Sequence, residues 1–162
     1  MRVLYHQRHS MYRLRGLINM AQSLCQLKKK GGNKVKEITL WTNGSPSSSF
    51  SNQTVSFNES YSDFSDIPYD YIEIQFKVSI SNATEGSLCI PKNSYDSISD
   101  ATVLRPCLGY YDNSSSAFYN RSFRLSISNS QVGMKFGDCT KTNASGVLNT
   151  ACIPTKIIGL KY

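Results

Sequence analysis

Histidine is scarce in this sequence, with only two residues of this type, His6 and His9, both near the N-terminus. A Ser-His-Asp or Cys-His catalytic arrangement uses a histidine as its general base, so either one would depend on this single stretch. The sequence also lacks a Walker loop, a G-x-G-x-x-G fingerprint and an H-E-x-x-H zinc motif. We therefore expect a protein that is not an enzyme, with no catalytic residues, no cofactor and no metal site.

Long apolar runs and N-terminal acidic residues are also missing. No apolar run approaches the ~20 residues that a membrane-spanning helix requires. Residues 1–36 hold nine of the 18 Lys and Arg residues and no Asp or Glu. Residues 37–162 hold the other nine basic residues and all 11 acidic ones, so their net charge is −2. Because the basic charge belongs to the N-terminal segment, we expect no nucleic-acid partner for the rest of the chain.

No pair of the five cysteines forms a C-x-x-C motif, which argues against a zinc knuckle. Two interpretations of the cysteines stay open. They can be small buried apolar residues, which is a common role for free cysteine. Alternatively, the four in the second part of the chain can form two disulfides, which would require an oxidising compartment. The five are Cys25, Cys89, Cys107, Cys139 and Cys152.

The basic N-terminal segment, residues 1–36, is predicted to be partly helical. Within residues 11–30, apolar side chains recur at the i, i+3, i+4, i+7 spacing of an amphipathic helix, and Gly31 and Gly32 are expected to end it. Polar interruptions make it a poor secretory signal. A targeting helix, a helix that contacts a membrane surface, a helix that packs on a partner subunit and an extension with little structure remain alternatives.

From residue 34 onward the sequence alternates with the period of two that is typical of β-strands. In the stretch 69–80, Ile72, Ile74 and Phe76 alternate with polar residues such as Glu73, which places one face in a core and the other in water. In the stretch 123–128, Phe123, Leu125 and Ile127 repeat the pattern. The predicted strands lie within 34–42, 53–57, 69–80, 86–90, 101–111, 123–128, 132–137 and 155–162.

Turn-forming mixtures of Asn, Asp, Gly, Pro and Ser separate these strands, at residues 43–49, 112–116 and 142–146 among others. About eight short strands with such turns, and no second helical pattern, indicate an all-β fold. We expect an antiparallel β-sandwich or jelly roll over residues 37–162.

Four aromatic residues flank the polar loop 112–117: Tyr110, Tyr111, Phe118 and Tyr119. Tyrosines beside small polar residues are typical of adaptable contact surfaces. They are also ordinary strand residues. We take the four as the candidate binding residues.

Carboxylates and asparagines raise two further hypotheses. Asp63, Asp66 and Asp70 could ligate calcium or flank a glycosidic bond, but Asp before a strand more often organises a turn. Sequons of the N-x-[ST] type exceed the number expected from composition, which would mean a glycan coat in a secreted protein, or only a turn-rich composition. The seven sequons begin at Asn43, Asn52, Asn58, Asn82, Asn113, Asn120 and Asn143.

Three stretches carry a resemblance: "ITLWTNGSPSSSFSNQTVSF" at 38–57, "YDYIEIQFKVS" at 69–79 and "CIPTKIIGLKY" at 152–162. They resemble the C-terminal domain of phage- and prophage-encoded minor structural proteins of gut bacteria, including tail-fibre and head-fibre proteins. The resemblance covers residues 37–162, and the basic N-terminal segment departs from it.

The resemblance implies a β-sandwich module on a virion appendage, often trimeric, which serves in host attachment or as decoration and has no catalytic residues. Its expected partners are copies of itself, other virion proteins and a glycan or protein of the host surface. The protein would be found in the virion, and in the host cytoplasm during assembly. The alternative is a secreted, N-glycosylated adhesion or receptor-like β-sandwich, which the sequons and cysteines favour.

Overall fold

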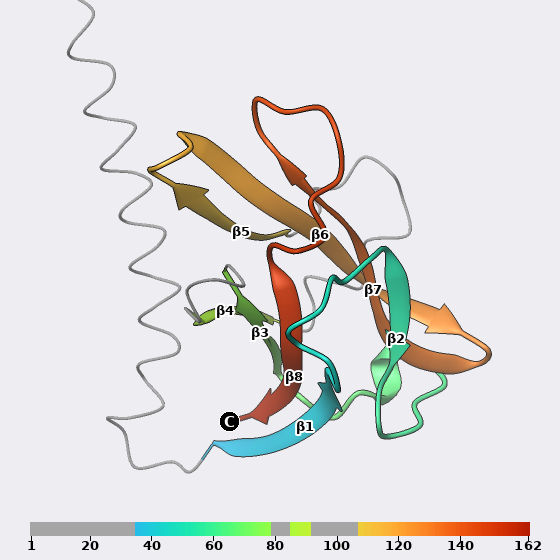
Figure 1. The fold of residues 1–162 in the computed structure, drawn as a ribbon. Helices are drawn as coiled ribbons and strands as arrows, with labels where there is room; N and C mark the ends of the chain where they lie inside the picture. Colours follow the sequence, from blue (N-terminus) through green and yellow to red (C-terminus); the bar gives the residue numbers. More distant parts are fainter. Residues whose placement is uncertain (1–34, 79–84, 92–106) are drawn as a thin grey trace, which may run out of the picture. The chain divides into compact units, whose positions relative to one another are not determined.

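The computed structural model describes residues 35–78, 85–91 and 107–162 of the chain (Figure 1). The chain divides into two compact units, Met1–Val35 with Tyr162, and Lys36–Lys161. The description below concerns the second unit. The predicted N-terminal helix, the two histidines, Cys25 and the sequon at Asn82 lie outside the described residues, as does part of the strand predicted at 101–111.

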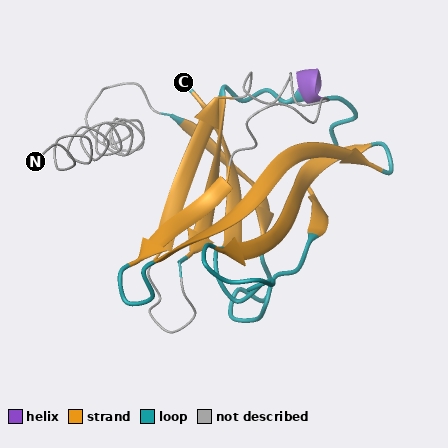
Figure 2. Cartoon of the chain, turned by 90° about the horizontal axis from the view of Figure 1, so that it is seen from above, coloured by secondary structure: helices purple, strands orange, loops and turns teal. Residues whose placement is uncertain are grey.

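Eight strands and one short 3-10 helix make up the described part of the second unit (Figure 2). Each of the eight stretches predicted from alternation overlaps one of the strands, although β6 and β7 begin or end several residues outside the predicted bounds. The elements are β1 (Lys36–Thr42), β2 (Gln53–Ser56), η1 (Phe64–Asp66), β3 (Tyr71–Lys77), β4 (Glu85–Pro91), β5 (Cys107–Asp112), β6 (Ala117–Ser128), β7 (Gln131–Lys141) and β8 (Ile153–Lys161).

The strands form two four-stranded antiparallel sheets, which confirms the prediction of an antiparallel all-β fold. The first sheet has the order β1-β8-β3-β4, and the second has the order β2-β7-β6-β5. The last strand, β8, is therefore a central strand of the first sheet, between β1 and β3 (Figure 1). The longest elements, β6 and β7, form a hairpin that is the centre of the second sheet.

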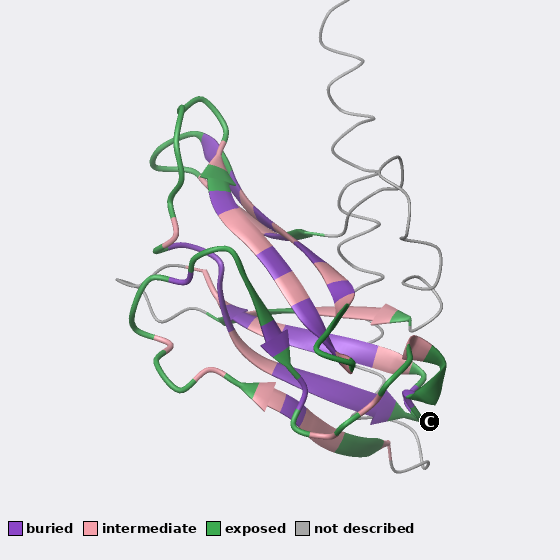
Figure 3. Ribbon diagram, turned by 90° about the vertical axis from the view of Figure 1, so that its right-hand side faces the viewer, coloured by how far each residue is buried: buried purple, intermediate pink, exposed green. Residues whose placement is uncertain are grey.

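One hydrophobic core joins the two sheets in a sandwich-like arrangement. It contains Ile72, Ile74 and Ile157 from the first sheet together with Leu125 and Met134 from the second. Buried positions alternate with partly exposed ones along the long strands, as Figure 3 shows for the described residues. This alternation is the consequence of side chains that point to opposite faces of a pleated strand.

Aromatic rings link the sheets at one end of the core. The centroid of the Phe136 ring in β7 lies 5.5 Å from that of Phe50, 6.2 Å from that of Phe123 and 6.4 Å from that of Trp41 in β1. Phe50 and Trp41 are also in edge contact, with centroids 6.0 Å apart. Phe136 is therefore the hub of a cluster that spans both sheets.

Two details of the predicted alternation are wrong. Glu73 was expected to face water, but it is only 5% exposed. Its strand lies between β8 and β4, so Ile158 and Cys89 flank it on both sides. Ile127 was expected in the core and is 46% exposed, because it lies at the end of β6, two residues before the turn at Asn129.

The turn between β6 and β7 is a two-residue hairpin. Asn129 and Ser130 both have positive φ angles, 52° and 58°. This is the geometry of a type I′ turn, which matches the twist of the flanking strands and which asparagine tolerates well. The turn sets the register of the hairpin, so that Ser128 pairs with Gln131.

Candidate functional site

The four aromatic residues proposed for binding lie in the β5–β6 hairpin, where they form two cross-strand pairs on opposite faces. Tyr110 pairs with Tyr119, and their rings stack with centroids 4.8 Å apart. Tyr119 is buried in the core. Tyr111 pairs with Phe118 on the other face, where they are 58% and 37% exposed. The structure therefore brings the residues together as a structural pair and an exposed pair, and their contact with a ligand stays a prediction.

The tip of this hairpin is held by side-chain hydrogen bonds. Asp112 Oδ1 accepts hydrogen bonds from Ser114 N at 2.9 Å and Ser114 Oγ at 2.7 Å, and Asp112 Oδ2 accepts one from Ser115 Oγ at 2.7 Å. These bonds, led by that from Ser115, lower the pKa of Asp112, so the tip keeps its negative charge at neutral pH.

The exposed aromatic pair, Tyr111 and Phe118, also has a fixed support. Phe118 N donates a hydrogen bond of 2.8 Å to Thr142 Oγ1, and Thr142 N donates one of 2.9 Å to Phe118 O. The Phe118 ring lies against Gly109, where an added Cβ would be only 2.6 Å from Phe118 Cζ. A glycine at this position therefore lets the ring lie flat on the strand, an arrangement known to support edge glycines in sheets.

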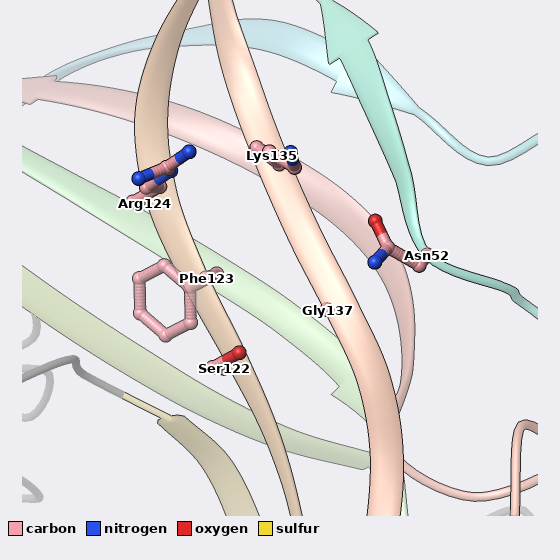
Figure 4. A pocket seen from close by; sticks show the side chains of 6 residues that line it. All are labelled: Asn52, Ser122, Phe123, Arg124, Lys135 and Gly137. Atoms are coloured by element: carbon pink, nitrogen blue, oxygen red, sulfur yellow. The ribbon is translucent and has the colours of Figure 1, made fainter. Parts of the chain in front are cut away.

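A pocket of about 250 Å³ lies on the outer face of the second sheet (Figure 4). We call it the outer-face pocket. Its walls come from β6, from β7 and from the segment before β2, whose Asn52 side chain points toward β7 in Figure 4. The lining residues are Asn52, Ser122, Phe123, Arg124, Lys135 and Gly137.

Two cations lie side by side in this pocket. Arg124 of β6 and Lys135 of β7 are direct cross-strand partners, and both are partly buried. Within the described part of the chain, neither side chain has a hydrogen bond or an ion pair. Like charges placed directly opposite each other destabilise a sheet. The Arg124–Lys135 pair therefore concentrates two positive charges, and among the described residues no carboxylate forms an ion pair with either of them.

The floor of the outer-face pocket is shaped by a β-bulge. The register shifts between Arg121 and Phe123, so Ser122 of β6 lies opposite both Gly137 and Asp138 of β7. Bulges of this kind redirect side chains and are enriched beside functional sites. A Cβ at Gly137 would lie 2.5 Å from Ser122 Oγ. The glycine thus leaves the Ser122 hydroxyl uncovered.

A hydrogen-bond network fixes the segment that carries Asn52. Asp138 Oδ1 accepts hydrogen bonds of 2.9 Å from Asn52 N and from Asn149 Nδ2. The bond from Asn149, followed by the bond from Asn52, lowers the pKa of Asp138. Asn149 Oδ1 in turn accepts a hydrogen bond of 3.1 Å from Cys139 N. The pocket wall formed by Asn52 is therefore tied to β7.

Arg121 is fully buried on the inner side of the same bulge. Its Nε donates to Cys152 O at 2.9 Å, its Nη1 to Gly137 O at 2.6 Å and its Nη2 to Ala151 O at 3.3 Å. The guanidinium carbon lies 5.3 Å from the centroid of the Phe50 ring. Arginine cannot lose its proton in a protein, so these carbonyls and the ring solvate a permanent charge. Burial lowers the pKa of Arg121 without neutralising it.

Two buried cysteines lie next to Arg121. Cys139 and Cys152 are both fully buried, and Cys139 Sγ donates a weak hydrogen bond of 3.9 Å to Thr140 O. The interaction with Cys152 and the Arg121 charge lower the pKa of Cys139, whereas the interaction with Cys139 and burial raise that of Cys152. Cys107 is exposed and Cys89 is partly buried, and among the described residues the thiols of Cys107, Cys139 and Cys152 form no disulfide. The interpretation of cysteine as a small buried residue thus applies to Cys139 and Cys152.

Two of the three aspartates considered for catalysis or calcium binding, Asp63 and Asp66, organise a turn, and the backbone of Asp70 bonds to β8. Asp63 caps η1: its Oδ1 accepts hydrogen bonds from Ser65 N at 2.9 Å and Ser65 Oγ at 2.8 Å. Asp66 Oδ2 accepts one from Asp63 N at 3.0 Å, which completes a capping box. Asp70 N donates to Leu160 O. Within residues 35–78, 85–91 and 107–162, no group of three or more His, Cys, Asp or Glu residues could hold a metal ion.

The sequon asparagines differ in what their side chains do. Asn43 Nδ2 donates a hydrogen bond of 2.9 Å to Pro154 O, and its Oδ1 accepts one from Ser45 N, so its amide helps to build the turn after β1. Asn120 Oδ1 accepts a hydrogen bond from Thr140 Oγ1. Asn113, at the tip of the β5–β6 hairpin, is exposed.

Comparison with known proteins identifies no relative of this chain. A scan against protein-family models, a search of curated proteins and a search of solved structures each found no match. Among the described residues, no helix has the length and apolar character that crossing a membrane requires. The functional interpretation therefore depends on the site geometry and on the sequence itself.

Proposed function

We propose that this chain is a non-enzymatic structural module of a phage or prophage virion, at the tip of a tail or head fibre or as a decoration domain, which attaches to the host surface. The single observation that carries this proposal is the exposed aromatic pair, Tyr111 and Phe118, on a hairpin fixed by Asp112 and Thr142. Rigid, partly polar aromatic side chains offer a large contact area at a low cost in conformational entropy.

The distribution of the resembling stretches in space supports the proposal. They contain most of β1 and all of β3 and β8, which are neighbours in the first sheet, and β2 at the edge of the second. The exposed aromatic pair and most of the outer-face pocket belong to β5, β6 and β7, which lie outside those stretches. The first sheet would then be a shared scaffold, and the second sheet would carry the contacts that distinguish one host from another.

The proposed fold within the sandwich class is a jelly-roll variant. Antiparallel pairing of β1 with β8 and of β2 with β7 brings the first and last strands together, as in a chain folded back along its length. We also propose that the module forms a homotrimer. In the virion this trimer would contact other virion proteins. Static light scattering on the full chain would then give three times the monomer mass of 18.1 kDa.

Removal of the exposed aromatic pair is expected to weaken attachment strongly. In the double variant Tyr111→Ser/Phe118→Ser, binding of the fluorescent full chain to intact gut bacteria should fall by about tenfold or more, because exposed aromatic anchors dominate contact energies. Flow cytometry across a panel of strains measures this.

The matched control removes two other exposed apolar side chains, in the variant Val147→Ser/Leu148→Ser. Its attachment should equal that of the unmodified chain. Equal loss in both variants, or no attachment of the unmodified chain to any strain, would contradict the proposal.

The second candidate function is the secreted, N-glycosylated adhesion or receptor-like domain. The contact between Cys139 and Cys152 favours it, because two thiols in contact can be oxidised to a disulfide in an oxidising compartment. Asn113, exposed on the hairpin tip, is an accessible glycan acceptor. Intact-mass measurement of secreted protein, with and without reductant, separates the two candidates: added glycan mass or paired loss of hydrogens supports secretion.

A further inference from the structure

We propose that the outer-face pocket binds the carboxylate or sulfate group of one acidic sugar unit. This inference rests on the proposed attachment function for its choice of a cell-surface saccharide as the source of the anion. The site is separate from the aromatic residues that the sequence singled out, and it lies on two strands, β6 and β7, joined by a tight turn.

The charge arrangement indicates an anionic ligand. Arg124 and Lys135 are direct cross-strand partners, and among the described residues neither has an acidic or hydrogen-bonding partner. The carboxylate next to this site, that of Asp138, does not line the pocket and accepts hydrogen bonds from Asn52 N and Asn149 Nδ2. An anion between Arg124 and Lys135 would relieve their mutual repulsion and accept charge-assisted hydrogen bonds from both.

The remaining groups of the pocket suit the hydroxyls of a sugar. The Ser122 hydroxyl and the Asn52 carboxamide each offer a donor and an acceptor. Gly137 leaves Ser122 Oγ uncovered, since a Cβ there would be 2.5 Å from that oxygen. Close approach of a ligand to the backbone is one of the physical reasons for glycine within a strand.

Size and total charge argue for a single acidic sugar over a nucleic acid. The volume of about 250 Å³ is below the range of pockets that enclose drug-sized molecules, so it suits one compact group. Residues 37–162 have nine basic and 11 acidic residues, whereas a surface for a polyanion needs an extended excess of positive charge.

The test is a titration of the full chain with sodium glucuronate, followed by ¹⁵N–¹H NMR, with glucose as the neutral control. We expect saturable shifts of β6 and β7 amides with glucuronate and none with glucose. Arg124→Gln and Lys135→Gln should each weaken glucuronate binding by about tenfold, because each removes one charge-assisted contact. Lys161→Gln, which removes an exposed cation from β8, should leave the affinity unchanged.

A second measurement needs no variant. The dissociation constant of the unmodified chain should rise with added sodium chloride, because salt screens the attraction between partly exposed charges. Glucuronate affinity that is unchanged in Arg124→Gln and Lys135→Gln, or independent of salt, would overturn the inference. Equal affinity for inorganic phosphate would reduce the site to a general anion site, and tighter, Arg124-dependent binding of a short single-stranded DNA would assign it to nucleic acid; both overturn the saccharide.

The outcome for this pocket is distinguishable from the outcome for attachment. If Arg124→Gln weakens glucuronate binding as predicted while the unmodified chain attaches to no strain, the pocket inference stands and the attachment function fails. If the unmodified chain attaches through Tyr111 and Phe118 but shows no glucuronate shifts, the attachment function stands and the pocket inference fails.

Discussion

Replacement of Arg121 by methionine is expected to lower the free energy of unfolding by about 3 kcal/mol or more. Methionine keeps much of the side-chain volume but none of the donors. The carbonyl oxygens of Ala151 and Cys152 would lose buried hydrogen bonds, and that of Gly137 would lose a partly buried one. A buried acceptor left unsatisfied costs ~1–3 kcal/mol, so the three losses together give the expected size.

Urea unfolding followed by tryptophan fluorescence measures this effect, since Trp41 is the only tryptophan of the chain and contacts the core cluster. The matched control is Arg124→Met, which removes the same side chain from the outer face of the same strand. Its stability should change by less than about 1 kcal/mol, because Arg124 has no partner within the described residues. Similar losses in the free energy of unfolding for Arg121→Met and Arg124→Met would contradict the claim that the hydrogen bonds of Arg121 stabilise the fold.

Replacement of Phe136 by alanine is the second change with a large expected effect, about 3–5 kcal/mol of lost stability. Phe136 is fully buried, and its ring contacts Trp41, Phe50 and Phe123. The loss of the ring removes apolar burial and leaves a cavity where the first sheet packs on the second. The tryptophan emission should also shift to the red, because Trp41 loses a neighbour and gains water.

Phe118→Ala serves as the control for Phe136→Ala, since it removes the same side chain from an exposed position of the second sheet. It should cost less than about 1 kcal/mol, as surface substitutions usually do. A loss under about 1 kcal/mol for Phe136→Ala would contradict the joint core of the two sheets.

The strands could be predicted from the sequence because burial on one face imposes a period of two. Ile72, Ile74 and Phe76 are buried as that period requires. The register of β6 and β7 was also within reach of sequence reasoning. A two-residue turn at Asn129 and Ser130 pairs Ser128 with Gln131, and counting back along both strands gives the pairs as far as Phe123 with Phe136, where the bulge shifts the register.

The outer-face pocket was not predicted, because its parts come from distant segments. Arg124 and Lys135 follow from the hairpin register, but the position of Asn52 depends on the pairing of β2 with β7 and on Asp138. The burial of Arg121 likewise depends on Ala151 and Cys152, about thirty residues further along the chain. Local alternation cannot reveal such contacts, since it contains no information on which strands become neighbours.

The aromatic residues show the same limit within one hairpin. Tyr110, Tyr111, Phe118 and Tyr119 look equivalent in the sequence, beside one polar loop. Their exposure differs because neighbouring strand residues point to opposite faces, which places Tyr119 in the core and Tyr111 in solvent. Knowledge of which face is inner was needed to reduce four candidates to the pair Tyr111 and Phe118.

The most direct test of the account is amide hydrogen–deuterium exchange of the full chain, alone and attached to cells of a strain that it binds. The central claim is that the second sheet makes the contact with the host. We predict slower exchange on attachment in the β5–β6 hairpin and beside Arg124 and Lys135, with no change in β1, β3 and β8. Protection confined to the first sheet, or unchanged exchange throughout the second, would contradict the account.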